Sequence, residues 1–170
     1  ISCGSAENVG NLANLPRQGN ERECFEPRKG FVYCSTDLDT AELRAWAQNC
    51  IDLLNVSVMG EDINSGRDPH LGLGADLLGI SYEQALANKK DVGVKEARQL
   101  AKIGNFGFMG SLREASFIEY AKGFGFHLTL DRAKEIYSKW SSRYIEAGPY
   151  FRFIKSLTRF DLATYKHHRS

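Results

Sequence analysis

Two cations and an aromatic residue lie on one stripe of a helical segment in the middle of the chain. Arg98, Lys102 and Phe106 are spaced four and four within the run Ala97–Gly107, which places them along one face of a helix. Arginine and lysine together can hold a polyphosphate, and a neighbouring ring can pack against a sugar or base. The alternative is a solvated basic face that ends in a buried phenylalanine, because exposed charge usually only faces water.

Two glycines interrupt the same segment at Gly104 and Gly107. Each costs about 1 kcal/mol in a helix interior relative to alanine. Their presence indicates that something approaches the helix backbone closely at this point.

A carboxylate follows directly after a β-prone run. Residues Phe31–Thr36 predict a strand, Asp37 lies at its end, and Glu42 falls in the first turns of the helix that follows. A carboxylate at the open end of a sheet is free to ligate a hard cation such as Mg²⁺. The alternative is an Asp–Thr40 helix cap with a solvated glutamate.

The turn Gly66-Arg-Asp-Pro-His70 presents a single histidine. Alone, such a residue is more often a capping or surface side chain than a functional one. Gly72-Leu-Gly74 lacks the rest of a dinucleotide-binding fingerprint. Neither a P-loop nor a nucleophile motif stands out.

Composition narrows the function classes. The 170 residues carry a net charge of +1, so no global electrostatic attraction to nucleic acid or to an anionic membrane is expected. The apolar runs are too short for a transmembrane helix. The four cysteines and four histidines lack zinc-site spacing, which favours reduced thiols in a cytoplasmic protein. The start lacks a methionine and a signal-peptide pattern, which suggests a processed product or a fragment.

Helical periodicity covers most of the chain, and residues 1–30 are expected to be irregular. A helix of about 14 residues is predicted from Thr40, and a short helix is predicted to begin at Ser81. Further helices are predicted over His70–Leu78, Val94–Met109, Ser111–Lys122, Thr129–Tyr144 and Tyr150–Leu157. A turn is predicted over Gly60–Gly66. The predicted fold class is α+β and predominantly helical, with one strand whose partners lie outside this chain.

In order, these segments resemble the family A (Pol I-type) DNA polymerases. Val32–Arg44 resembles motif A, in which Glu-Leu-Arg begins five residues after an aspartate, and Arg98–Gly107 resembles motif B, the O-helix of the fingers. Asn11–Pro16 is similar to the family's Asn-Leu-Gln-Asn-Ile-Pro segment, and Gly66–His70 to its Gly-Lys-Asp-Ile-His segment. Together the matches span residues 11 to about 110.

The resemblance implies a metal site and a residue that selects the sugar of the incoming nucleotide. Asp37 matches the aspartate that ligates two Mg²⁺ ions in the catalytic centre, with the Leu38 carbonyl as a further ligand. Glu42 matches the position that excludes a ribose 2′-OH. Asn14 falls where the family contacts the primer–template DNA.

It also implies a site for the incoming dNTP. Arg98 and Lys102 match the cations that hold the triphosphate, with Lys102 also counted as catalytic, and His70 matches a third triphosphate contact. Phe106 matches the ring that packs against the incoming sugar. Phosphoryl transfer needs charge neutralisation and alignment rather than a protein nucleophile, which agrees with these residue types.

Departures from the family pattern shape the expected function. Ala13 replaces a glutamine that contacts DNA, and Gly110 replaces the tyrosine that usually ends the O-helix, as in phage-type members. Motif C, the His-Asp-Glu that supplies the second metal-binding aspartate, has no match, and Asp161 is the only late aspartate. We therefore expect little catalysis from this chain alone.

The expected organisation is a partial palm with the motif A strand over 1–44, fingers over 45–147 with the O-helix at about 94–110, and a return segment over 148–170. The expected function is DNA-directed DNA polymerisation in replication, with Mg²⁺ as cofactor and primer–template DNA, dNTP and the remainder of the polymerase as partners, in the cytoplasm of a bacterial or phage-infected cell. Two alternatives stay open: a non-catalytic nucleotide- or DNA-binding remnant, and one half of a split polymerase that needs a partner chain for motif C.

Overall fold

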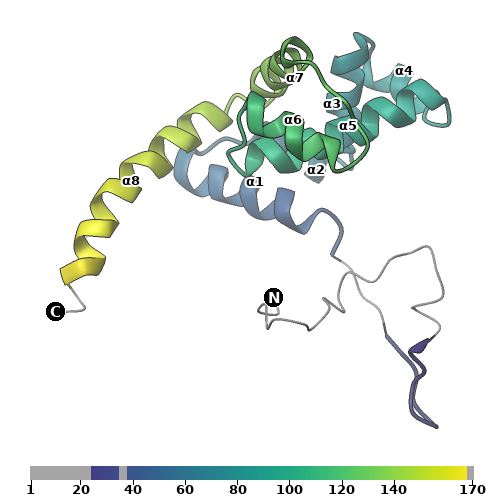
Figure 1. Cartoon of the computed structure of the whole chain (residues 1–170), viewed down its shortest axis with the longest axis horizontal. Helices are drawn as coiled ribbons and strands as arrows, with labels where there is room; N and C mark the ends of the chain where they lie inside the picture. Colours follow the sequence, from purple (N-terminus) through teal and green to yellow (C-terminus); the bar gives the residue numbers. More distant parts are fainter. Residues whose placement is uncertain (1–23, 35–37, 168–170) are drawn as a thin grey trace. The chain divides into compact units, whose positions relative to one another are not determined.

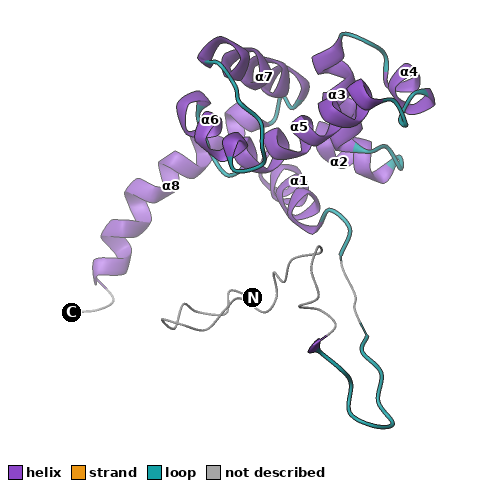
Figure 2. Cartoon of the chain, turned by 45° about the vertical axis from the view of Figure 1, so that its right-hand side comes forward, coloured by secondary structure: helices purple, strands orange, loops and turns teal. Residues whose placement is uncertain are grey.

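The computed structural model describes residues 24–34 and 38–167, with side chains as far as Leu157. These residues form eight α-helices and no β-strand (Figures 1 and 2). The chain divides into two compact units, Ile1–Leu38 and Asp39–Ser170. All eight helices lie in the second unit, so the predominantly helical fold class predicted from periodicity is confirmed.

The described part of the first unit is an irregular loop. The Phe31 N–H donates to the Arg28 carbonyl at 2.9 Å, and the Tyr33 hydroxyl donates to the Glu26 carbonyl at 2.8 Å. The strand predicted over residues 31–36 is wrong for 31–34, which have no regular structure; residues 35 and 36 lie outside the described part. A strand needs a neighbouring strand for its backbone hydrogen bonds, and the described residues supply none.

Several helices of the second unit begin or end at capping signals of the sequence. Their bounds are α1 Ala41–Leu54, α2 Val58–Asn64, α3 Pro69–Leu78, α4 Tyr82–Ala87, α5 Val92–Met109, α6 Glu114–Lys122, α7 Leu130–Arg143 and α8 Ala147–His167. Helix α3 ends at Gly79, whose φ of 70° suits glycine. Helix α4 begins with the predicted Ser81–Gln84 capping box, and the Thr129 side chain caps α7. These predictions are confirmed.

The turn predicted over Gly60–Gly66 is wrong for residues 60–64, which form most of α2, and is confirmed for residues 65–66. Ser57 precedes the helix, and its hydroxyl accepts a hydrogen bond from the Gly60 N–H at 3.0 Å. The Glu146 carboxylate then accepts from the Ser57 hydroxyl and from the Met59 N–H, both at 3.1 Å. A tertiary contact from a residue far along the chain therefore stabilises a helix that its glycine and aspartate disfavour.

Helix α8 is longer than predicted and begins at Ala147 rather than Tyr150. Gly148 and Pro149 lie in its first turn, where a proline loses no helical hydrogen bond. Helix α6 begins at Glu114 rather than Ser111, because Ser111 has a φ of 69° and turns the chain away from α5. None of the described helices is long and apolar enough to cross a membrane.

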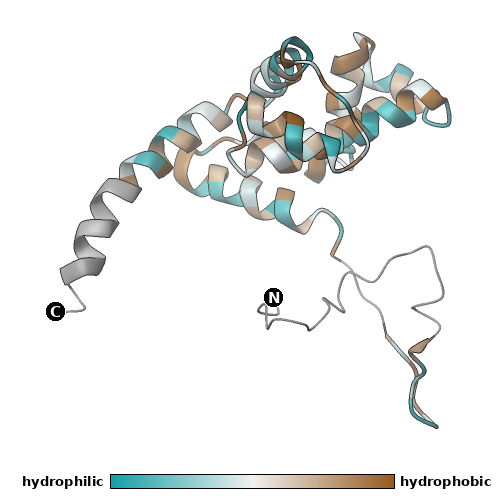
Figure 3. Ribbon diagram, viewed as in Figure 1, coloured by the Kyte–Doolittle hydropathy of each residue, from teal (hydrophilic) through white to brown (hydrophobic). Residues whose placement is uncertain are grey.

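Buried aromatic side chains hold α1, α5, α7 and α8 together. The Trp140 ring of α7 lies 6.2 Å from Trp46 of α1, 5.5 Å from Phe108 of α5 and 5.9 Å from Tyr144, measured between ring centroids. Trp46 in turn contacts Tyr150 of α8 at 5.6 Å. Apolar and polar residues alternate around the helices (Figure 3), so each helix presents an apolar side to this core.

Helix α5 is continuous through Gly104 and Gly107. A Cβ on Gly107 would lie 3.2–3.3 Å from side-chain atoms of Leu112, Phe117 and Tyr120. The close approach predicted for this position is therefore made by the chain's own α6 and the loop before it.

Two further glycines let neighbours approach α3. A Cβ on Gly74 would lie 3.1 Å from the N and Cα atoms of Arg98 in α5, and a Cβ on Gly72 would overlap the Arg143 guanidinium of α7. Real Cβ atoms seldom come this close to a neighbouring backbone. The Gly72-Leu-Gly74 sequence thus serves helix packing.

A largely buried arginine braces the opposite side of α3. Arg143 Nη2 lies 2.6 Å from Asp62 Oδ2 of α2, and Nη1 lies 2.9 Å from Asp76 Oδ2 of α3. Burial by itself would lower the pKa of Arg143, but the neighbouring Tyr144 and the two aspartates outweigh it and raise that pKa. The side chain is only 16% exposed, so its charge depends on these partners.

We predict that Gly74→Ala lowers the free energy of unfolding by about 1–3 kcal/mol, because the added methyl group meets the α5 backbone, which cannot rotate away. Gly93→Ala is the matched control: it lies in α5, and a Cβ there has nothing within 4 Å. That change should be neutral or slightly stabilising. Urea unfolding of both variants by circular dichroism checks this, and equal stabilities would contradict it.

Candidate functional site

One carboxylate fixes both the start of α3 and a cation of α5. Asp68 Oδ1 accepts from the backbone N–H groups of His70 at 2.9 Å and Leu71 at 3.2 Å, which caps α3. Asp68 Oδ2 accepts from Nε of Arg98 at 2.7 Å. Partial burial opposes ionisation of Asp68, but the hydrogen bond and charge of Arg98, with the Leu71 N–H, outweigh it and lower the pKa of the carboxyl.

His70 is buried beside this pair and is uncharged at neutral pH. Its exposed fraction is 4%, and burial lowers its pKa to about 4. The positive charges of Arg98 and Lys102 also lower it, against the opposing charges of Asp68 and Asp39. The ring therefore stays neutral although carboxylates lie near it.

The outer face of α5 carries the two cations and the ring that the sequence predicts. Lys102 is exposed, Arg98 is half-exposed, and Phe106 is half-buried with its ring 5.7 Å from that of His70. Lys102 forms no ion pair within the described part of the chain. The structure thus brings together four of the predicted site residues: His70, Arg98, Lys102 and Phe106.

The start of α1 differs from the predicted helix cap. Thr40 has a left-handed backbone with a φ of 51°, and its side chain makes no capping hydrogen bond. Thr40 therefore does not cap the helix in the way that the Asp–Thr40 interpretation required. This conformation is strained for a β-branched residue. Glu42 lies exposed in the first turn and shares no hydrogen bond or ion pair with His70, Arg98 or Lys102.

The predicted metal and DNA contacts are not described by the structure. Asn14 and Asp37 lie outside the described residues, and Leu38, at the end of the first unit, is 80% exposed. Within the described ranges, no group of three His, Cys, Asp or Glu side chains could hold a metal ion. The described residues therefore do not by themselves fit a Mg²⁺ site.

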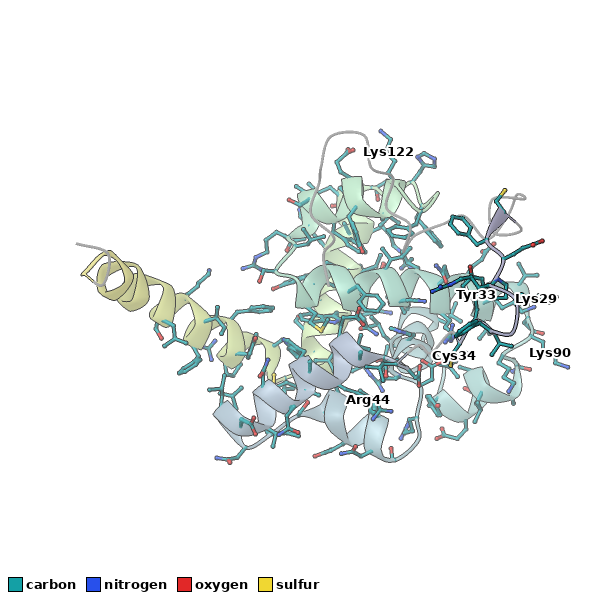
Figure 4. The ribbon with its side chains drawn as sticks, turned by 90° about the horizontal axis from the view of Figure 1, so that it is seen from below. Lys29, Tyr33, Cys34, Arg44, Lys90 and Lys122 are labelled. Atoms are coloured by element: carbon teal, nitrogen blue, oxygen red, sulfur yellow. The ribbon has the colours of Figure 1, made fainter. Side chains whose placement is uncertain are left out.

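Other basic side chains lie on separate elements. Arg44 is on α1, Lys90 lies between α4 and α5, and Lys122 ends α6; all three are exposed (Figure 4). Arg44 Nε donates to the Asp39 carbonyl at 3.2 Å. Arg98 and Lys102 of α5 differ from these three residues, because they lie beside a neutral histidine and a half-buried phenylalanine ring.

Two residues of the site were not assigned a role from the sequence: Asp68 and Asn105. The Asp-Pro pair directly before His70 is a helix-start signal that could have identified Asp68. Asn105 lies seven residues after Arg98 and three after Lys102, which places it on the same helix face. Its Nδ2 lies 2.9 Å from Nδ1 of His70.

Chemically, the cluster suits a polyanion rather than a covalent step. Arginine offers planar donors and lysine a point charge to phosphate oxygens, and a neutral imidazole offers one further N–H. No cysteine, serine or carboxylate in the cluster has the arrangement of an activated nucleophile. The exposed edge of Phe106 supplies an apolar surface beside the charges.

This chain is similar to DNA polymerase I of Aquifex aeolicus (strain VF5), with 30% identity over 125 residues. The match covers 73% of the chain but 19% of that protein, so the chain spans about a fifth of the relative's length. No protein-family model matches the chain. The similarity supports a relationship to DNA polymerases of this type, as the motifs predict.

We predict that Asp68→Asn lowers the free energy of unfolding at pH 7 by up to about 1 kcal/mol, because asparagine keeps the cap but loses the ion pair with Arg98. The folded state lowers the Asp68 pKa below 3.8, so its contribution is present above that pH and is lost as the pH falls through the folded-state value. The difference from wild type should therefore decrease as the pH falls below 3.8.

Urea unfolding at pH 7 and pH 2 checks this expectation. Asp131→Asn is the control, because that side chain is 97% exposed and lies 4.0 Å from Lys134. A loss for Asp68→Asn that is the same at both pH values would show that the ion pair is not its source.

Proposed function

We propose that this chain is the dNTP-binding part of a family A DNA polymerase, comprising the fingers and the motif A portion of the palm. The observation that carries the proposal is the joint position of His70, Arg98, Lys102 and Phe106 on α3 and α5, in a chain similar to DNA polymerase I. The proposed division is palm over 1–44, fingers over 45–147 and a return segment over 148–170. Its partners would be primer–template DNA, dNTP and the rest of the polymerase, in the cytoplasm.

Each residue would contribute to binding and alignment. Arg98 and Lys102 would neutralise the triphosphate, with Asp68 holding the Arg98 guanidinium in place. Phe106 would pack against the sugar, and Glu42 would exclude a 2′-OH. Alignment and charge neutralisation are the main protein contributions to phosphoryl transfer.

The relationship to DNA polymerases suggests a divalent metal cofactor, which would stabilise charge on the phosphates. Asp37 and the Leu38 carbonyl remain the proposed ligands for Mg²⁺. Because motif C has no match in the sequence, a second carboxylate would come from the remainder of the polymerase, in the same or a partner chain.

We predict that Lys102→Ala weakens dATP binding to the 170-residue chain about tenfold or more, because one charge-assisted contact to the triphosphate is lost. Isothermal titration calorimetry measures the change. Lys134→Ala is the matched control: it removes one exposed lysine on α7 and should leave affinity unchanged. Equal losses in both variants would indicate only a general charge effect.

Glu42→Ala separates a polymerase from a binding remnant. The substitution is made in a polymerase completed with a motif C palm, and primer extension is measured with dATP and ATP. We expect the variant to accept ATP more readily than the parent, because the carboxylate no longer occupies the space of a 2′-OH. A completed protein that binds dATP and never extends a primer would favour the non-catalytic alternative.

A further inference from the structure

The hydrogen bond between Asn105 and His70 determines which ring nitrogen carries the proton. Asn105 Nδ2 lies 2.9 Å from His70 Nδ1, and an amide NH₂ group can only donate. With the amide in this orientation Nδ1 accepts, which corresponds to the tautomer of the neutral ring that carries its proton on Nε2. The ring is thus defined both in orientation, by Asn105 and the Phe106 contact, and in tautomer.

Asn105 is a costly residue for this position. Its exposed fraction is 0%, and its Oδ1 is buried without a hydrogen-bond partner in the described part of the chain. An unsatisfied buried carbonyl costs about 1–3 kcal/mol, and asparagine is a poor former of helix interiors. Stability alone would favour an apolar side chain here, so the benefit of Asn105 lies in what it does to His70.

We propose that Asn105 is a positioning residue that holds His70 as a neutral hydrogen-bond donor, with Nε2–H as the group that binds a phosphate oxygen of the nucleotide. The proposal rests on the proposed function, since it assigns a role within the same dNTP site. The residues of the cluster then have different roles: Arg98 and Lys102 supply positive charge, and His70 supplies a directed N–H without charge.

The charges around His70 keep this arrangement stable near neutral pH. Arg98 and Lys102 of α5 disfavour protonation of the ring, whereas Asp68 before α3 and Asp39 before α1 favour it. Burial and the cations prevail and lower the pKa of His70 to about 4. Between pH 6 and pH 8 the ring therefore neither gains a proton nor changes its donor atom.

Asn105→Asp should reverse the arrangement with almost no change in shape. A carboxylate accepts rather than donates, so it stabilises a proton on Nδ1. The neutral ring would then turn an unprotonated Nε2 toward the phosphate, and only the protonated ring would keep a donor there. Asn105→Leu removes the donor without adding an acceptor, which makes it the matched variant.

The first test needs no nucleotide. We expect nitrogen-15 NMR of the histidine rings in the wild-type chain at pH 7 to show one neutral ring with Nε2 protonated, which disappears in His70→Gln. In Asn105→Asp, that ring should be protonated on Nδ1 or on both nitrogens. A wild-type His70 that is positively charged, protonated on Nδ1, or a mixture of tautomers would overturn the proposal.

The second test measures dATP affinity of wild type and variants at pH 6 and pH 8. The ratio of variant to wild-type affinity cancels titration of the nucleotide itself. For Asn105→Asp we expect binding about tenfold weaker at pH 8 and a smaller deficit at pH 6, where protonation restores the donor. For Asn105→Leu the deficit should be the same at both pH values.

The affinity measurement is repeated in the His70→Gln variant, because the glutamine amide offers a hydrogen-bond donor and has no tautomers. Adding Asn105→Asp to His70→Gln should change affinity by less than about twofold at either pH. An undiminished tenfold loss in that background would overturn the proposal and leave Asn105 a purely structural role. Circular dichroism checks folding, and if Asn105→Asp does not fold, the wild-type spectrum and the Asn105→Leu affinities decide.

Failure of the proposed function has a different signature. A wild-type chain that shows the Nε2-protonated ring but binds no dATP would contradict the nucleotide site, and with it the phosphate role of His70. The tautomer assignment would remain valid in that case. A chain that binds dATP with a charged His70 would retain the proposed function and overturn the role of Asn105.

Discussion

The site depends on the distance between two helix backbones. Helices α3 and α5 meet where Gly74 has no side chain and the backbone of Arg98 occupies that space. Both bonds that define the cluster cross this contact: Asp68 to Arg98 at 2.7 Å and Asn105 to His70 at 2.9 Å. Hydrogen bonds weaken steeply when they lengthen or tilt, so a small separation of the helices would affect both.

The opposite side of α3 is held by charges that play no part in the cluster. Arg143 joins Asp62 of α2 and Asp76 of α3 to α7, and Lys139 Nζ donates to the Asp76 carbonyl at 2.7 Å. An arginine that is mostly shielded from water and paired with two carboxylates is held in position, because leaving its charge unpaired there is costly. Helix α3 is thus clamped on one side, which defines the position of His70 on the other.

Neutral and charged donors serve different purposes in such a cluster. A third positive charge beside Arg98 and Lys102 would be repelled by both, and burial would add to that cost. A neutral imidazole avoids the repulsion and still offers a directed N–H. The chain obtains this donor by burying His70 and by orienting it with an amide, at the expense of an Asn105 carbonyl that has no partner among the described residues.

The sequence by itself determined the local features of this protein: the caps at Ser81 and Thr129, the glycine stop at Gly79, and the stripe of Arg98, Lys102 and Phe106, all of which arise from short-range spacing. It also predicts a phosphate-bearing ligand, because arginine and lysine are residue types that hold phosphates. It could not determine α2, whose N-terminus is bound by Glu146 from a distant part of the chain, or the length of α8. The strand expected over 31–36 is absent from its described part, residues 31–34. A strand depends on hydrogen bonds to a neighbouring strand, which the local sequence does not determine. Only the tertiary structure decided the surroundings of His70, since its burial and its contact with Asn105, an asparagine 35 residues away, depend on how α3 and α5 pack.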